Sequence, residues 1–377
     1  MSIVACMALI LALIMMSMNI PLAFLAGAMI FSFTNGLTTG SWGSTGWFSV
    51  ESFSLLAIPL FLIAGTLMER SGIAGALVDL GQKLTDKEGK GRGLANAIPV
   101  VSGFFGALCG SGLATASTMC TMLGPRLEQK GYKKEFIYGL IACSSPFGYM
   151  IPPNMNAIIY AKVANASVAD LFMATVIPGI LWIIFYIIIN RFMVPKYFFP
   201  ENAVASATVA TEVKKQQSNW QLFRSLIPAI LMPVIILGGI YGGVFTATEA
   251  GAVGCLYGVI VGVCIYRTVK TRDLFDIFAT AAYQMGSLQI IFPFTMIFTR
   301  IMVTNGVPDM VTSFVTGVSD SKIVIILILV AVLFVAGFFL DGNILLLVLT
   351  PLLLPTATSV GMSVIQFAVL VFVALGV

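Results

Sequence analysis

The chain has 377 residues, of which 59% are hydrophobic and 10% are charged, with a net charge of +4 and a mean hydropathy of +1.01. Because soluble domains average about 25% charged residues, this composition excludes an ordinary soluble protein. Histidine is absent, the six cysteines show no CxxC spacing and there is no P-loop, which argues against a Cys/His metal site, a histidine base and encoded ATP hydrolysis.

The apolar segments are too long for tilted β-barrel strands and lack their alternation. At about 20 residues per span, the length allows about ten spans, so we predict an all-α polytopic membrane protein. The first apolar segment, 2–33, is too long for a signal peptide and is expected to break near Pro21. Further spans are expected over residues 53–69, 136–163, 168–195, 225–244, 249–267, 279–303, 323–338 and 362–377. Interfacial amphipathic pieces are expected at 72–84 and 271–278, with a polar connector at 199–222.

Residues 94–124 lie between two basic loops, 81–93 and 125–135. Because the positive-inside rule places both loops on the cytoplasmic side, the segment is predicted to enter and leave on that side as a re-entrant hairpin. Its middle reads CGSGLATAS, where Gly110, Ser111 and Gly112 allow a tight turn whose oxygens suit a hard cation. The alternative is a small-residue surface for helix packing.

The stretch SSPFGYMIPPNMN, residues 144–156, breaks the apolar span around it. Pro146 and the Pro152–Pro153 pair each remove helix hydrogen bonds, and the freed carbonyls need partners, for which Na⁺ is chemically suited. Ser144, Ser145, Asn154 and Asn156 supply further oxygens. A proline-kinked structural helix is the alternative.

The stretch FFLDGNILL, 338–346, places Asp341, Gly342 and Asn343 within apolar sequence. An intramembrane carboxylate is a functional-site hypothesis, and we predict the tip of a second hairpin over 339–358, against the alternative of a surface loop. The stretch 336–355 weakly repeats 102–125, as expected for an inverted repeat.

Two further places are candidates. Thr246, Thr248 and Glu249 follow a glycine-rich turn, and a helix cap accounts for them without any ligand. Arg300 is a candidate anchor for a substrate carboxylate, although it could equally extend its side chain to the membrane surface.

Five segments resemble the large membrane subunit, of the DctM type, of tripartite ATP-independent periplasmic (TRAP) transporters. They are SLLAIPLFLIAGTLMERSGIA (54–74), SGFFGALCGSGLATAS (102–117), GYKKEFIYGLIACSSPFGYMIPPN (131–154), GGIYGGVFTATEAGAVG (238–254) and FFLDGNILLLVLTPLLLP (338–355). The resemblance implies an ion-transporter-like inverted repeat with re-entrant hairpins and broken helices. It also implies Na⁺-coupled import of a small organic acid by an elevator movement, with no cofactor and no enzymatic activity.

The resemblance implies two Na⁺ sites in this sequence. The first comprises Ser111, Gly112, Ser144, Pro146 and Asn154. The second comprises Thr246, Thr248, Asp341, Gly342 and Asn343. The sequence departs from the family pattern at Cys109 and Asn154, where serine is usual, and at Ala247, where proline is usual. The second Pro-Pro broken helix of the family has no counterpart here, so we expect this chain to lack a C-terminal part.

The resemblance divides the chain into scaffold helices (1–93), the first half of a transport domain (94–167), further scaffold helices (168–278) and an incomplete second half (279–377). Expected partners are a separate small four-helix membrane subunit, a periplasmic substrate-binding protein and the lipid bilayer, but no nucleic acid. The expected location is the cytoplasmic membrane of a bacterium or archaeon. The alternatives are an ion-coupled carrier that needs no binding protein, a non-transporting assembly subunit and, remotely, an intramembrane enzyme.

Overall fold

The computed structural model describes residues 3–71, 77–81, 93–199 and 219–376, which are almost entirely helical. The helices of the first half are α1 (Ile3–Met15), α2 (Ile20–Thr34), α3 (Trp42–Val50), η1 (Phe53–Leu56), α4 (Ala57–Arg70), η2 (Leu94–Asn96), α6 (Ala97–Cys109), α7 (Gly112–Met122), α8 (Gly124–Gln129), α9 (Lys134–Ser144), α10 (Phe147–Met150), α11 (Met155–Ala164) and α12 (Val168–Tyr197). Those of the second half are α13 (Asn219–Tyr241), α14 (Ala247–Val259), the π-helical turn η4 (Ile260–Ile265), α15 (Thr271–Thr304), α16 (Val307–Val318), α17 (Lys322–Gly337), α18 (Gly342–Ser359) and α19 (Val364–Leu375).

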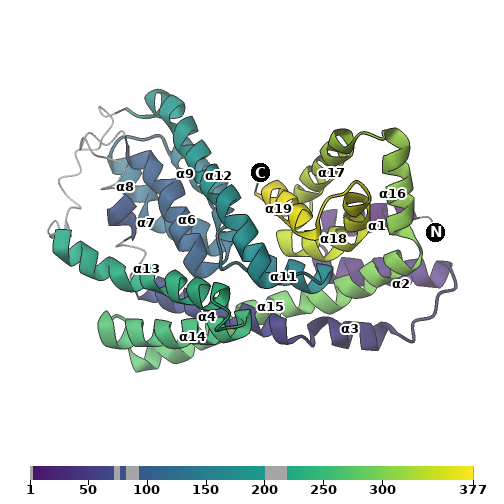
Figure 1. Ribbon diagram of the computed structural model, residues 1–377, viewed down its shortest axis with the longest axis horizontal. Helices are drawn as coiled ribbons and strands as arrows, with labels where there is room; N and C mark the ends of the chain where they lie inside the picture. Colours follow the sequence, from purple (N-terminus) through teal and green to yellow (C-terminus); the bar gives the residue numbers. More distant parts are fainter. Residues whose placement is uncertain (1–2, 72–76, 82–92, 200–218, 377) are drawn as a thin grey trace.

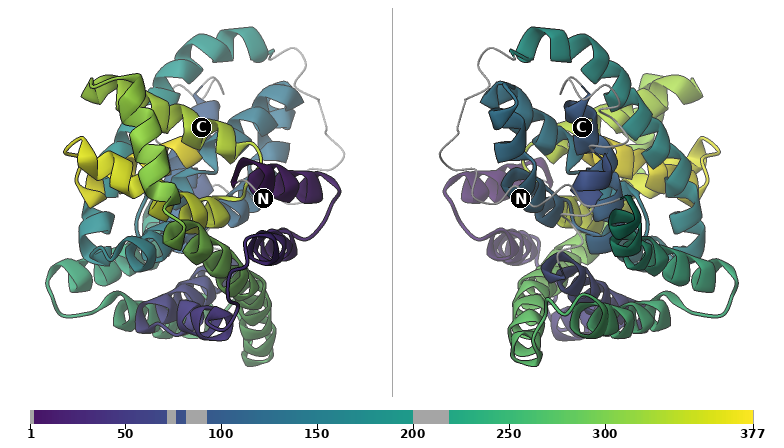
Figure 2. Two further views of the ribbon diagram at one scale, coloured as in Figure 1. Left: turned by 90° about the vertical axis from the view of Figure 1, so that its right-hand side faces the viewer. Right: turned by 90° about the vertical axis from the view of Figure 1, so that its left-hand side faces the viewer.

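Two lobes stand on a base of long helices (Figure 1). One lobe contains α6 to α9 and α12, the other contains α16 to α19, and the base is formed by α3, α4, α13, α14 and α15. The pair α1 and α2 lies on one side of the molecule in both end views (Figure 2). The chain ends between the two lobes, where α19 packs on α12.

The two halves repeat the same packing. α14 packs along α4, and in the matching position of the other half α2 packs along α15. α13 pairs with α14 as α1 pairs with α2, and each half carries a helical hairpin, α6–α7 and α17–α18. The contacts therefore repeat between the two halves as expected for an internal repeat, with α4 equivalent to α15 and α7 equivalent to α18.

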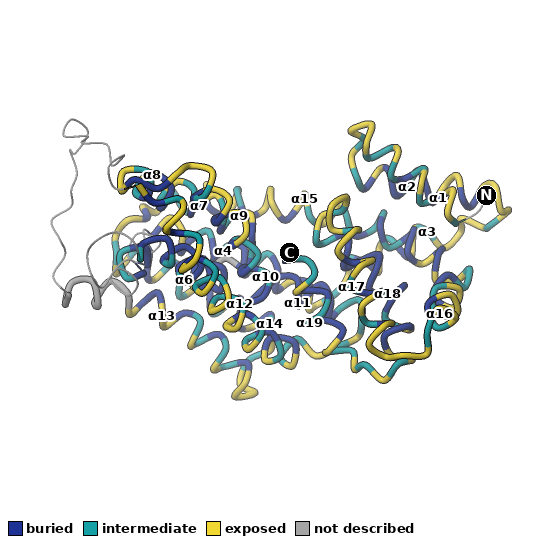
Figure 3. The backbone as a smooth tube through the Cα atoms, turned by 90° about the horizontal axis from the view of Figure 1, so that it is seen from above, coloured by how far each residue is buried: buried dark blue, intermediate teal, exposed yellow. Residues whose placement is uncertain are grey.

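Within the described residues, five helices are long and apolar enough to cross a bilayer: Phe53–Arg70, Val168–Tyr197, Ala247–Ile265, Thr271–Thr304 and Gly342–Ser359. A helix can cross lipid because it satisfies its own backbone groups. Exposed apolar residues lie three and four positions apart along α12, namely Met173, Ile177, Leu181, Phe185, Ile188 and Phe192. Figure 3 shows α12 exposed along its outer face, whereas much of α18 is buried.

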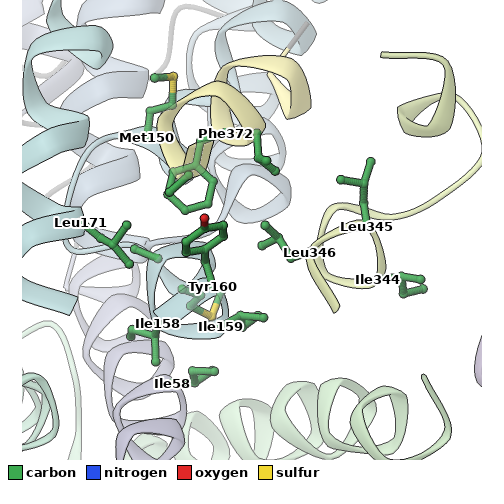
Figure 4. Close-up of a cluster of buried hydrophobic side chains, with 14 of the residues drawn as sticks. Ile58, Met150, Ile158, Ile159, Tyr160, Leu171, Ile344, Leu345, Leu346 and Phe372 are labelled. Atoms are coloured by element: carbon green, nitrogen blue, oxygen red, sulfur yellow. The ribbon is translucent and has the colours of Figure 1, made fainter. Parts of the chain in front are cut away.

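The centre of the molecule is α11, which packs against both α18 and α19 of the second half. Tyr160 of α11 is fully buried, with its ring centroid 5.8 Å from that of Phe372 and its hydroxyl donating to the carbonyl of Val364 at 2.7 Å. Figure 4 shows these rings facing each other, with Leu346 of α18 beside them. The broken helix of the first half is thereby held in the core of the second.

Several predicted elements are confirmed. Residues 94–124 form a hairpin, 136–163 form a span broken into α9, α10 and α11, and 168–195 form one helix. The first apolar segment is interrupted at residues 16–19, and Pro21 lies in the first turn of α2, where its missing N–H costs nothing. The interfacial piece 72–84 and the connector 199–222 lie mostly outside the described residues.

Two predictions about the second half are wrong. Residues 271–278 are the first turns of α15 rather than a separate interfacial piece, because Asp273 accepts a hydrogen bond from the amide of Lys270 and no proline follows before Pro293. The second hairpin is longer than 339–358, because α18 alone takes 18 residues and the first arm is α17. Two short helices, α3 and α16, were not expected from the sequence.

Candidate functional site

The tip of the first hairpin is a two-residue turn. Gly110 ends α6 in the left-handed conformation, with φ of 61°, which glycine adopts without a steric penalty. Ser111 is the N-cap of α7, and its Oγ accepts from the amide of Ala114 at 3.4 Å. The carbonyl of Ser111 accepts from Thr115 Oγ1 at 2.8 Å. The prediction of a turn at CGSG is confirmed.

The broken helix faces this tip. α9 ends at Ser144, Pro146 begins the single turn of α10, and the chain is extended at Ile151 and Asn154. Asn154 is the N-cap of α11, where its Oδ1 accepts from the amide of Ala157 at 2.8 Å. The prolines therefore divide one span into three helical pieces, as predicted from their missing N–H groups.

The tip and the break are in backbone contact. A Cβ atom added to Gly148 would lie 2.9 Å from the carbonyl oxygen of Ser111 and 3.0 Å from the amide nitrogen of Gly112. One added to Gly110 would lie 3.2 Å from the carbonyl oxygen of Pro153. These glycines allow the two irregular segments to meet without side chains between them.

Polar atoms without partners remain near this contact. Ser144 and Asn154 are 0% and 1% exposed, and neither Ser144 Oγ nor Asn154 Nδ2 has a hydrogen-bond partner among the described residues. Buried polar groups are normally paired, so unpaired ones indicate a bound ion, water or ligand. The structure thus brings the five residues of the first predicted site onto the tip and the facing break.

The tip of the second hairpin is capped differently. Asp341 is the N-cap of α18, and its Oδ1 accepts from the backbone amide and from Nδ2 of Asn343, both at 3.0 Å. A Cβ atom added to Gly342 would lie 3.9 Å from Nδ2 of Asn156, which belongs to the broken helix of the first half. The second tip therefore lies against the same break as the first.

Both tips open onto one cavity of about 550 Å³. Ser111 lines it from the first tip, Asp341 and Asn343 from the second, and Tyr149 and Asn156 from the break. The remaining lining residues come mainly from α4, α7 and α15: Leu62, Gly65, Thr66, Glu69, Leu113, Ala114, Ser117, Met155, Tyr283, Gln284, Ser287, Leu288 and Ile291. Two carboxylates, those of Glu69 and Asp341, line the cavity, and no lysine or arginine of the described chain does.

Sequence reasoning missed the contribution of α4 and α15. Glu69 of α4 accepts a hydrogen bond of 2.9 Å from the hydroxyl of Thr118 in α7. In the equivalent pair of the second half, Thr299 of α15 donates to the carbonyl of Leu347 in α18 at 3.2 Å. A signal was available on α15, where Tyr283, Gln284 and Ser287 form a polar group at helical spacing within an apolar segment.

Thr246 and Thr248 do not line the cavity. Thr246 and Glu249 form a reciprocal capping box at the start of α14, with Thr246 Oγ1 accepting from the amide of Glu249 at 3.3 Å. Thr248 Oγ1 donates to the carbonyl of Phe53 at 2.9 Å. The Thr246–Glu249 pair forms the cap that the alternative predicted, whereas the bond of Thr248 is a contact with η1 that the sequence did not predict.

Arg300 is also separated from the tips. It lines a second cavity of about 260 Å³ with residues of the α2–α3 segment. Arg300 lies thirteen positions after Ser287 on α15, which is roughly 20 Å along a helix.

The side chains that line the main cavity offer hydroxyl, amide and carboxylate oxygens, which are ligands that hard cations such as Na⁺ accept. Within the described residues, no group of three or more His, Cys, Asp or Glu side chains is placed to hold a metal ion.

Comparison with known proteins shows the family of this chain. Residues 4–377 match the family described as the tripartite ATP-independent periplasmic transporter, DctM component. The chain belongs to the DctM family of TRAP transporters. It is therefore a multi-pass membrane protein and the large component of a transporter, not an enzyme.

Relatives of this DctM chain include the protein YgiK of Salmonella typhimurium, 32% identical over 85% of this chain and 71% of YgiK. The isethionate TRAP transporter permease protein DctMQ of Oleidesulfovibrio alaskensis is 30% identical over 87% of this chain, which spans half of that relative. The crystal structure of the YdaH transporter of Alcanivorax borkumensis aligns with a TM-score of 0.58 at 14% identity, covering 89% of this chain and 76% of that one. That likeness shows a shared fold.

Proposed function

We propose that this DctM chain is the permease of a Na⁺-coupled importer of a small organic acid. The observation that carries the proposal is the single cavity onto which both hairpin tips and the broken helix open. In a coupled carrier the occupancy of the ion site changes the affinity of the substrate site, and sites that share one cavity can do this by direct contact.

The first Na⁺ site would use the oxygens of Ser111 and the freed carbonyls of the break, beside Ser144, Pro146 and Asn154. The second would use Asp341 with the backbone around Gly342 and Asn343. Asp341 places a negatively charged carboxylate at the second tip, and its electrostatic attraction favours a cation there. We leave Thr246 and Thr248 out of the proposed site, because they lie outside the cavity and their hydroxyls are already engaged by Glu249 and by the carbonyl of Phe53. Ser144, Pro146 and Asn154 do not line the cavity either, but Ser144 and Asn154 each keep a buried polar atom without a partner among the described residues.

An organic acid in this cavity meets the carboxylates of Glu69 and Asp341 and no basic side chain of the described chain. We infer that bound Na⁺ offsets this repulsion and that the substrate carboxylate binds after the ion. Its hydrogen-bond donors would be neutral groups, among them Nδ2 of Asn156, which is buried and has no partner within the described residues.

Movement would take the hairpins and the broken helix past α4 and α15. The repeat pairs α15 (Thr271–Thr304) with α4, so we place both in the scaffold, which differs from the expected boundary at residue 279. The moving part would comprise α6 to α11 and α17 to α19. The hydrogen bonds Thr118–Glu69 and Thr299–Leu347 cross this boundary and would break and re-form in each cycle.

The proposed partners are a small membrane subunit and a periplasmic binding protein that delivers the substrate, in the cytoplasmic membrane of a bacterium. The word tripartite in the family description supports a three-component system. One relative is named as an isethionate transporter permease, which supports a small organic anion as the substrate.

The test is uptake by proteoliposomes that contain this chain, the small subunit and the binding protein. Uptake should follow an imposed Na⁺ gradient, and Asp341→Asn should lose that dependence while Asp320→Asn, an exposed acid outside the cavity, should keep it. Uptake that does not depend on the Na⁺ gradient would contradict the proposed Na⁺ coupling. Uptake that needs no binding protein would favour an independent ion-coupled carrier.

A further inference from the structure

The second cavity, about 260 Å³, forms where the end of α15 meets the segment leading into α3. Its polar lining residues are Thr38, Ser41, Thr45, Arg300, Thr304 and Asn305. No acidic residue of the described chain lines it. It is distinct from the main cavity, because the two share no lining residue.

Among the described residues that line this cavity, Arg300 is the charged one. Its side chain forms no ion pair or hydrogen bond with the described residues, although guanidinium groups usually pair with oxyanions where these are near. The residue is exposed at the cavity rather than packed beneath it. Its five N–H donors are therefore available to a ligand.

The N-terminus of α3 supplies a second group of donors. Ser41, the N-cap, makes no side-chain capping hydrogen bond, so the amides of Gly43 and Ser44 lack the partner that a cap would provide, whereas the amide of Trp42 donates to the carbonyl of Thr39 at 3.1 Å. A Cβ atom added to Gly43 would have no neighbour within 4 Å, which leaves these amides open to approach. A helix N-terminus with open amides favours anions.

Thr45 gives an independent observation. It lines the cavity one turn into α3 and is only 8% exposed, yet its Oγ1 has no hydrogen-bond partner among the described residues. A buried hydroxyl without a partner carries a desolvation cost that a ligand oxygen would offset.

Hydrogen-bond donors partly offset the negative end of α15. The hydroxyl of Thr304 donates to the carbonyl of Arg300 at 2.9 Å, and Nδ2 of Asn305 donates to the carbonyl of Ile301 at 2.7 Å. The amide of Gly306 donates to the carbonyl of Val303 at 3.1 Å, so these groups reduce the negative charge that the helix dipole places at this end.

We propose that this cavity is a binding site for one oxyanionic group, a phosphate or a carboxylate, held by Arg300, the first turn of α3 and Thr45. The ligand is either an anionic lipid headgroup or a dissolved anion, which present the same oxygens to these donors. The site lies outside the cavity between the hairpin tips and does not depend on the proposed Na⁺ coupling.

The test uses the full chain purified in a neutral detergent in Na⁺-free choline buffer, so that it does not depend on the proposed ion sites. Thermal unfolding is followed against increasing inorganic phosphate, succinate, short-chain phosphatidylglycerol or diacylglycerol of the same chain length. Arg300→Gln removes the charge, and Thr45→Val removes the hydroxyl at similar volume. Arg272→Gln is the matched control, because Arg272 is an exposed arginine at the other end of α15.

The expected result is a saturable rise in the unfolding temperature of the wild type and of Arg272→Gln with at least one anionic probe. Arg300→Gln should weaken that binding roughly tenfold, or about 1.4 kcal/mol, and Thr45→Val should weaken it less. A response to phosphatidylglycerol alone identifies a lipid headgroup, and a response to phosphate or succinate identifies a dissolved anion.

The proposal is overturned if no anionic probe gives a saturable rise, or if Arg300→Gln binds as tightly as the wild type. If Arg300→Gln unfolds at a lower temperature without any probe, Arg300→Lys replaces it. Lysine keeps the charge but loses the planar fork, so this variant should bind more weakly than the wild type. Equal binding by Arg300→Lys and the wild type would then contradict the proposal that the guanidinium group of Arg300 holds the anion.

Discussion

Gly148 packs directly on the backbone of Ser111, joining the break in one helix to the tip of the hairpin that faces it. A Cβ atom on Gly148 would lie 2.9 Å from the carbonyl carbon and from the carbonyl oxygen of Ser111. Both neighbours are backbone atoms, which cannot turn aside as the end of a side chain can. The geometry of the first tip therefore depends on the absence of a side chain at position 148.

The first prediction follows from this contact. Gly148→Ala should lower the free energy of unfolding by about 1–3 kcal/mol, because the added methyl forces the tip away from the break. It should also weaken Na⁺ binding at the first site. Gly139→Ala is the control, since a Cβ there has no neighbour within 4 Å and alanine favours the helix. Equal effects of the two substitutions would contradict the close contact.

The second tip should respond differently. A Cβ atom added to Gly342 would lie 3.6 Å from Leu375 and 3.9 Å from Asn156, which are ordinary van der Waals distances. Gly342→Ala should therefore change the free energy of unfolding by less than about 0.5 kcal/mol, within the range of neutral substitutions. Chemical denaturation of the purified chain measures this, and a loss as large as that of Gly148→Ala would show that the two tips are packed alike.

The hydrogen bond between Thr118 and Glu69 should couple α7 to α4. The single variants Thr118→Val and Glu69→Ala and the double variant define a cycle, from which we expect a coupling energy of about 1 kcal/mol, given the 2.9 Å distance. Unfolding measurements on the four proteins give this value. Additive effects of the two substitutions would mean that the bond contributes nothing to stability.

The capping box of α14 makes a contrasting prediction. Thr246→Ala should cost about 1 kcal/mol of stability, because it removes the acceptor for the amide of Glu249. Na⁺ affinity should stay at its wild-type value, since Thr246 does not line the main cavity. If the Thr246→Ala variant has normal stability but binds Na⁺ more weakly, Thr246 belongs to the ion site and the capping interpretation is wrong.

The sequence predicted those parts of the site that depend on local backbone chemistry. Gly110 and Ser111 mark a turn through glycine conformation and serine capping, and Pro146 marks a break because proline has no N–H. These rules act within a few residues, so a single sequence is enough to apply them. These local rules identify the hairpin tip and the break from the sequence alone.

What the sequence could not supply are contacts between distant segments. That Asn156 of the first half lies beside Gly342 of the second depends on how α11 packs on α18. The place of Glu69 in the cavity depends on the position of α7, and the separation of Arg300 from the tips depends on the length of α15 as one helix. Tertiary packing decides all three.

Sodium binding to the purified chain tests the central claim most directly. Titration with radioactive Na⁺ in potassium buffer should show saturable binding that Ser111→Ala and Asp341→Asn each weaken, by roughly tenfold if one charge-assisted contact is lost. Asp320→Asn should bind Na⁺ as the wild type does. Binding that is unchanged in both cavity variants, or that K⁺ displaces as well as Na⁺ does, would contradict the assignment of the two hairpin tips as sodium sites.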